Sequence, residues 1–131
     1  MRIRWGRVVV AAISAEVGAI VALVALVALF GPKEAAAAQA YAERLGAWVG
    51  PIGGAVMCFI GGLWVARSAG HRGVMHGVLV GFVASLIDSA LLIGMGAAFQ
   101  FLFVASNLGK IVAGGLGGWV ARGRASVSGD A

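Results

Sequence analysis

Four long apolar runs dominate this 131-residue chain, and they constrain its fold more than any other feature. They cover residues 8–30, 47–66, 74–95 and 99–121. Each has roughly the 20 apolar residues that a helix needs to cross a bilayer. Because only 11% of the residues are charged, against roughly 25% in soluble domains, the chain cannot cover a water-exposed surface. The sequence therefore predicts an all-α, integral membrane four-helix bundle, with a single transmembrane domain over residues 1–122.

The segments between and after these runs differ in length and character. Residues 31–46 form the only sizeable connection, and helix-forming residues follow Pro32 there. Ala37, Tyr41 and Leu45 recur every four residues, which favours a short helix over 33–45 on the outer membrane surface. Residues 67–73 and 96–98 are expected to be tight turns, and residues 123–131 a disordered cytoplasmic tail.

Lys and Arg are divided unevenly between the two ends of the predicted bundle. Seven lie at the end that carries both termini, and Lys33 and Arg44 lie at the other. The seven are Arg2, Arg4, Arg7, Arg67, Arg72, Arg122 and Arg124. The positive-inside rule therefore places both termini in the cytoplasm, as in a multi-pass protein of a bacterial inner membrane. Because nine of the ten basic residues lie outside the apolar runs, we expect a lipid bilayer and no nucleic acid as partner.

Helix one has an alternative interpretation as a cleaved signal peptide. The start MRIRWGR is a basic segment, and Ala38-Gln39-Ala40 offers a cleavage site of the A-x-A kind. The apolar run is longer than the 7–15 residues typical of a signal core, and it contains Glu16. These features favour a helix that is retained.

A short internal repeat links the second and fourth runs. GGLWVAR ends at Arg67 and LGGWVAR ends at Arg122, and both close a helix that runs from the outer to the inner side. A duplicated two-helix hairpin explains this repeat. The alternative is that such helix ends commonly combine small residues, an interfacial Trp and an Arg.

Three ionisable residues interrupt the apolar runs: Glu16, Asp88 and Lys110. Each costs about 2.5–3.5 kcal/mol at a helix centre on insertion scales, so a specific role is expected. The run midpoints place Lys110 near the membrane midplane, with Glu16 ~4–5 Å to the cytoplasmic side and Asp88 ~4–5 Å to the outer side. Ser85 and Asn107 share helical stripes with Asp88 and Lys110. The predicted buried charge network is Glu16, Asp88, Lys110, Asn107 and Ser85.

Glycines recur at four-residue spacing on three of the runs, which places them on one stripe of each helix. Such stripes let two helix backbones approach closely. The predicted packing residues are Gly46, Gly50 and Gly54, then Gly73, Gly77 and Gly81, then Gly114 and Gly118. The sequence does not distinguish contacts within one chain from those of a homo-oligomer or with a membrane partner protein.

Two functions fit the membrane-embedded charges, and the sequence favours the first. In the first, Lys110 pairs with carboxylates and fixes helix register, so that the chain is a non-enzymatic packing or assembly protein. In the second, Glu16 or Asp88 carries a proton or binds a cation in a small proton- or cation-coupled transporter. No metal-ligand spacing, nucleophile–base pair or nucleotide-binding motif occurs, so we expect no enzyme, no cofactor and no metal.

Two resemblances rest on short motifs. Ala15-Glu16-Val17-Gly18 in the first helix resembles the start of small multidrug-resistance transporters, which implies a four-span fold and a Glu16 that exchanges protons for cationic drugs. The chain departs from them in carrying Lys110 and in lacking an aromatic-rich segment in helices two and three. The segments RIRWGR, GGLWVAR and MHGVLVG, with a Gly-rich last helix, resemble uncharacterised four-span bacterial inner-membrane proteins. That second resemblance implies fold and location but no activity.

Overall fold

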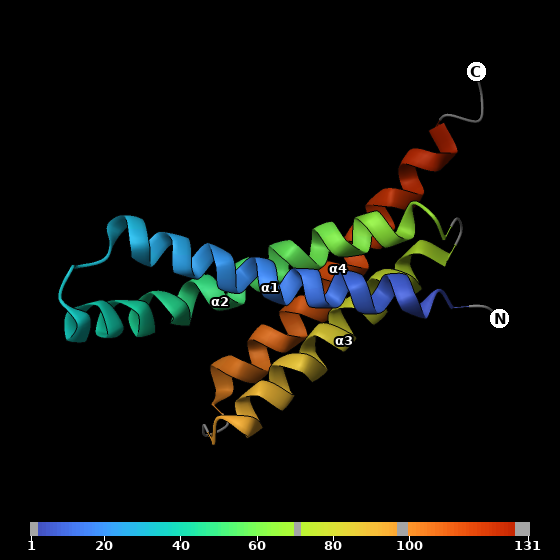
Figure 1. Cartoon of the computed structure of the whole chain (residues 1–131). Coiled ribbons are helices and arrows are strands. Elements are labelled where there is room, and N and C mark those ends of the chain that lie inside the picture. The colour runs from blue at the N-terminus through green and yellow to red at the C-terminus, as the bar shows by residue number, and fades with distance from the viewer. Residues whose placement is uncertain (1–2, 70–71, 97–99, 128–131) are drawn as a thin grey trace.

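Each apolar run of the sequence forms one long helix. The computed structural model describes residues 3–69, 72–96 and 100–127, and in them the helices are α1 (Trp5–Phe30), α2 (Ala35–Ala66), α3 (Gly73–Gly94) and α4 (Phe101–Val127) (Figure 1). All four are long and apolar enough to cross a membrane. The prediction of an all-helical chain with four candidate membrane spans is therefore confirmed.

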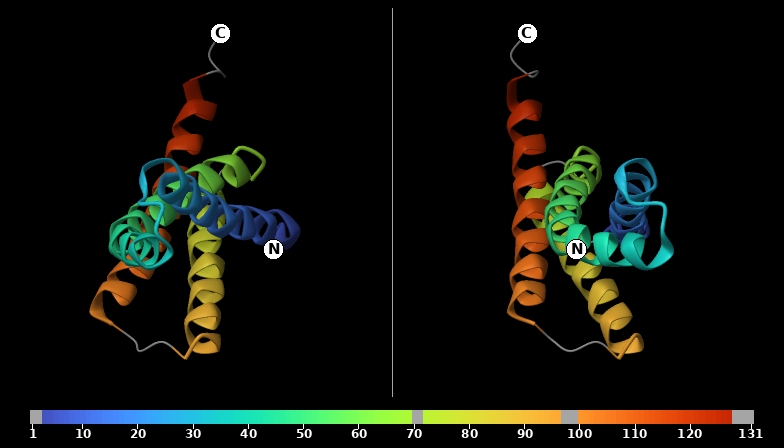
Figure 2. Two further views of the ribbon diagram at one scale, coloured as in Figure 1. Left: turned by 60° about the vertical axis from the view of Figure 1, so that its left-hand side comes forward. Right: turned by 90° about the vertical axis from the view of Figure 1, so that its left-hand side faces the viewer.

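The helices form two hairpins that cross and then separate. The α1–α2 hairpin and the α3–α4 hairpin diverge toward their connections, whereas both termini lie at the opposite end of the bundle (Figures 1 and 2). Helices α2 and α3 pack against both α1 and α4, but α1 and α4 make little direct contact. A side chain that joins α1 to α4 must therefore pass between the two middle helices.

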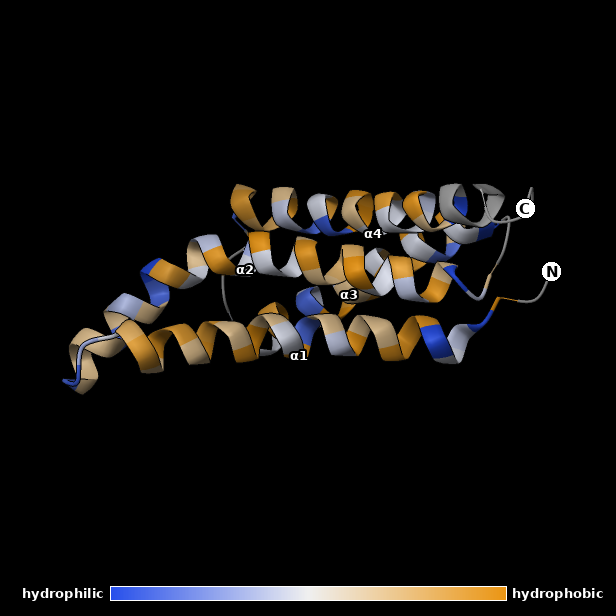
Figure 3. Ribbon diagram, turned by 90° about the horizontal axis from the view of Figure 1, so that it is seen from above, coloured by the Kyte–Doolittle hydropathy of each residue, from blue (hydrophilic) through white to orange (hydrophobic). Residues whose placement is uncertain are grey.

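The bundle buries small residues and exposes large apolar ones. Helix α1 turns a stripe of Val8, Ala11, Ala12, Ala15 and Ala19 inward. Its other faces expose large apolar side chains such as Ile13, Val17 and Val24. Figure 3 shows hydrophobic colour along the outward faces of the helices. This arrangement suits a hydrocarbon environment, in which helices associate through close packing of small residues.

Glycines bring the backbone of α4 into contact with α3. A Cβ on Gly77 would lie 2.9 Å from the carbonyl carbon of Gly114, and one on Gly73 would lie 2.9 Å from the carbonyl oxygen of Gly118. A Cβ on Gly81 would meet the backbone of Lys110 and Ile111. The predicted packing residues on α3 and α4 therefore lie at a helix contact within one chain.

The predicted glycine stripe on α2 is only partly a contact. A Cβ on Gly54 would meet the side chain of Lys110, and one on Gly46 would make ordinary contact with Leu23. Gly50 has no atom within 4 Å of such a Cβ, so it makes no close helix contact within the chain. The close approach of α2 to α4 instead uses Gly62 and Gly117, which lie nearer the termini than the predicted stripe. The cause is the divergence of the two hairpins, which separates the helices around Gly50.

Two predicted boundaries differ from the structure. The surface helix over 33–45 and the span over 47–66 are one continuous helix, α2, because nothing in Ala47-Trp48-Val49 stops helix propagation. Pro51 lies inside this helix, where it removes only one backbone hydrogen bond. The predicted tail is helical as far as Val127, since Gly123 costs only about 1 kcal/mol in a helix that is already formed.

Several predicted features lie outside the described residues. They are the basic residue Arg2, residues 70–71 and 97–98 of the two predicted turns, the start of the fourth run at residue 99 and the last four residues of the predicted tail, 128–131.

Candidate functional site

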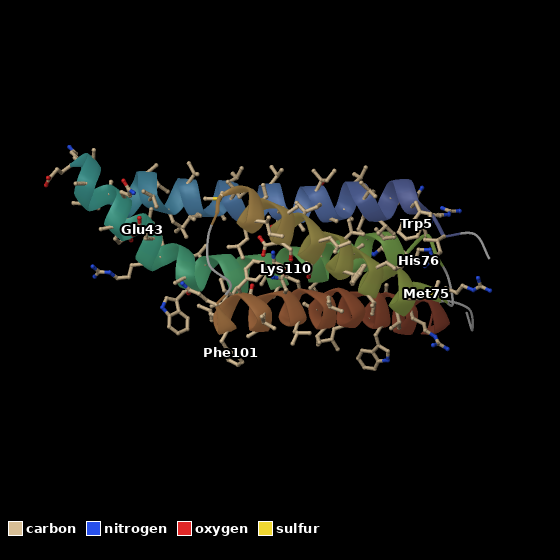
Figure 4. All side chains as sticks on the ribbon, turned by 90° about the horizontal axis from the view of Figure 1, so that it is seen from below. Trp5, Glu43, Met75, His76, Phe101 and Lys110 are labelled. Atoms are coloured by element: carbon tan, nitrogen blue, oxygen red, sulfur yellow. The ribbon has the colours of Figure 1, made fainter. Side chains whose placement is uncertain are left out.

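Lys110 meets the carboxylates of Glu16 and Asp88 at the centre of the bundle. Its Nζ donates a hydrogen bond to Glu16 Oε1 at 2.7 Å and lies 3.0 Å from Asp88 Oδ2. Figure 4 shows Lys110 between the helices, with Glu43 toward one end of the bundle and Trp5 toward the other. The three side chains come from α4, α1 and α3, and we call them the charge triad.

The lysine side chain reaches α1 because α2 has no side chain in its path. A Cβ on Gly54 would lie 2.5 Å from Lys110 Cε, closer than atoms pack. The lysine stem therefore occupies the space that any other residue at position 54 would fill. Gly54 was expected to contact a helix backbone, but it accommodates a charged side chain instead.

The members of the triad differ in exposure. The Lys110 and Glu16 side chains are 3% and 9% exposed, whereas the Asp88 side chain is 27% exposed. Lys110 and Glu16 thus form a buried pair that links α4 to α1. Asp88 is bound on one side by Lys110 and is open on the other.

Ser85 and Asn107 lie beside the triad but have other hydrogen-bond partners. Ser85 Oγ lies 2.8 Å from the Gly81 carbonyl oxygen and 3.1 Å from that of Asn107, and it can donate to either. Asn107 Nδ2 donates to the carbonyl oxygen of Phe103. Each side chain has a bond within one helical turn, which is the usual alternative for short polar groups, and Ser85 also reaches the backbone of α4. Within the described residues the predicted network of five is therefore a triad and a separate pair.

A cavity of about 500 Å³ extends from the triad into the space where the hairpins separate. All three triad residues contribute to its wall. Most other lining residues are apolar, and Gln100 and Ser106 add polar groups. The apolar lining residues are Ala19, Ile20, Leu23, Ala47, Leu91, Leu92, Met95, Leu102 and Phe103. The cavity thus runs from the triad to the residues that flank the α3–α4 connection.

Gly50 and Pro51 line this cavity from α2, and neither was predicted to have this role. Pro51 has no N–H group, so the carbonyl of Ala47 lacks its usual helical donor. Ala47 is itself part of the cavity wall. A proline within an apolar run is the sequence signal that could have marked this wall.

The charge balance of the site favours a cation. Two carboxylates and one ammonium, each in its ordinary ionised form, sum to a formal charge of −1 at the inner end of the cavity. The partly exposed carboxylate is Asp88, so the uncompensated charge faces the cavity. In residues 3–69, 72–96 and 100–127 no three His, Cys, Asp or Glu side chains lie close enough to hold a metal ion.

Comparison of the chain with known protein families, with curated proteins and with solved structures gave no match. The class of the protein therefore rests on its four apolar helices, which suggest a multi-pass helical membrane protein.

Proposed function

We propose that the chain is a small proton- or cation-coupled transporter of the bacterial inner membrane that uses Glu16 and Asp88. The cavity at the triad is the observation that carries this proposal, because a purely structural charge network needs no such space. The partial exposure of Asp88 gives a proton or cation a route to the carboxylates. Helix α1 is retained in this proposal, since its removal would take Glu16 away from Lys110.

Both termini face the cytoplasm in this proposal. The seven-to-two division of Lys and Arg supports this orientation, and an even number of spans returns the chain to the same side. A reporter that fluoresces only in the cytoplasm is expected to give signal when fused after Ala131. The same reporter inserted between Lys33 and Glu34, in the opposite connection, is the matched control and should stay dark. A dark C-terminal fusion with normal expression would contradict the orientation.

Transport is tested with purified protein in vesicles that are acidic inside and contain a pH-sensitive dye. Adding an external monovalent cation is expected to raise the internal pH faster than in empty vesicles, because protons leave as the cation enters. The double variant Glu16→Gln, Asp88→Asn is expected to fall to the rate of empty vesicles. Ser89→Ala is the control, since Ser89 lies on α3 but does not line the cavity. Wild-type vesicles that respond to no cation, or an unimpaired double variant, would refute the proposal.

A packing or assembly role is the second candidate, and the buried pair favours it. Lys110 connects α4 to α1, two helices that otherwise make little direct contact. In that role the triad specifies how the helices assemble, within one chain, a homo-oligomer or a complex with a membrane partner. Neutral replacement of all three charged residues, argued below, separates the two candidates.

A further inference from the structure

We propose that the cavity binds an alkylammonium ion, a primary amine with a short aliphatic chain. This inference rests on the proposed function and names the class of cation that the site takes. It follows from three features of the site: the size and lining of the cavity, the charge at its inner end and the way Lys110 is held.

The size and lining of the cavity suit a ligand that is larger than a bare ion and partly apolar. Its volume of about 500 Å³ lies within the range of roughly 300–1,000 Å³ typical of small-molecule sites. Aliphatic side chains from all four helices form most of the wall, including Ile20, Leu91 and Leu102. A hydrated proton or a metal cation gains nothing from such a wall, whereas a hydrocarbon chain does.

The charge at the inner end selects the head group. With both carboxylates ionised the triad sums to a formal charge of −1, so a monovalent cation neutralises it. The contact with Lys110 uses Asp88 Oδ2, and Asp88 is the carboxylate that is open to the cavity. A cationic head at the inner end can therefore bind Asp88 while Lys110 keeps its bond to Glu16.

Lys110 itself shows the chemistry that this site accommodates. It is an aliphatic stem that ends in an ammonium group, and that group contacts two carboxylates. A primary amine presents the same N–H donors on the same kind of stem. Phe103 is the sole aromatic residue in the cavity wall, so the described residues provide no aromatic cage of the kind that holds quaternary ammonium groups.

Binding is tested by calorimetric titration of n-hexylamine into the detergent-purified full chain at neutral pH. Wild-type protein is expected to give saturable binding. Hexyltrimethylammonium has no N–H donor, and 1-hexanol has no charge, so both are expected to bind about tenfold more weakly or worse. Equal affinity for the alcohol and the amine would overturn the proposal, because partition into the micelle explains that result.

Two variants locate the site, and one is a matched control. Asp88→Asn keeps the Lys110–Glu16 pair but removes the surplus charge, so affinity for hexylamine should fall about tenfold or more. Gly50→Leu adds side-chain volume to the cavity wall at a position where a Cβ would have no atom within 4 Å, and it should weaken binding similarly. Ser89→Ala should bind as wild type does. Retained affinity in both Asp88→Asn and Gly50→Leu would overturn the proposal.

Failure of this inference differs from failure of the proposed function. Vesicles that exchange protons for Na⁺ or K⁺, from a protein that binds no hexylamine, would refute the alkylammonium ligand and leave transport intact. Saturable hexylamine binding without any cation-driven proton flux would support the ligand site and refute transport.

Discussion

Gly77→Leu is expected to prevent the chain from assembling this bundle. A Cβ at Gly77 would lie 2.9 Å from the carbonyl carbon of Gly114 and 3.2 Å from the amide nitrogen of Gly118. Both atoms belong to the backbone of α4, so no side-chain rotation can relieve the clash. The two helices would have to separate, which we expect to cost about 4 kcal/mol or more, an exceptional effect for one substitution. Gly114→Leu should have the same effect, since its nearest neighbours are the backbone of Gly77 and Gly81.

Gly109→Leu on the same helix is the matched control. A Cβ there would have no atom within 4 Å, and loss of a glycine in the middle of a helix is itself favourable by roughly 0.5–1 kcal/mol. The measurement is thermal unfolding in detergent, together with elution as one species in gel filtration. If Gly77→Leu and Gly109→Leu are equally stable, α3 and α4 do not pack through these glycines.

The helices were predictable from the sequence because their cause is local. Apolar run length is read directly from the chain, and in a bilayer every backbone polar group has to be satisfied within a helix. The end of α2 that begins at Ala35 was not predictable in the same way. Ala, Gln and Glu suit a separate surface helix and an extension of the span equally well, and the choice depends on packing against α1.

The residues of the triad were also predictable, but the role of each was not. Run midpoints place Glu16, Asp88 and Lys110 at similar depths, which is a one-dimensional argument about distance from the midplane. Whether a side chain crosses between two other helices depends on a gap, here the absence of a Cβ on Gly54. The cavity depends on the angle between the hairpins, and no periodicity in the sequence reports that angle.

Lys110→Met is expected to destabilise the bundle by about 3–5 kcal/mol, because it leaves Glu16 and Asp88 close together with no cation between them. Methionine fills the same path past Gly54, so the loss reports charge and not a cavity. In a chain of this size the loss lowers the unfolding temperature in detergent by about 10–20 °C. Lys33→Met removes an exposed lysine from the α1–α2 connection, and this variant should unfold at the same temperature as the wild type.

The triple variant Lys110→Met, Glu16→Gln, Asp88→Asn is expected to recover most of that loss, since no uncompensated charge remains and neutral replacement of a buried ion network is often tolerated. The same variant separates the two candidate functions. A transporter that uses these carboxylates would fold as the triple variant but give no cation-driven proton flux in vesicles. Full proton flux from a stable triple variant would show that transport does not need these charged residues, so that packing is their only role. If Lys110→Met instead unfolds at the same temperature as the wild type, the triad contributes no stability, and the packing role loses its support.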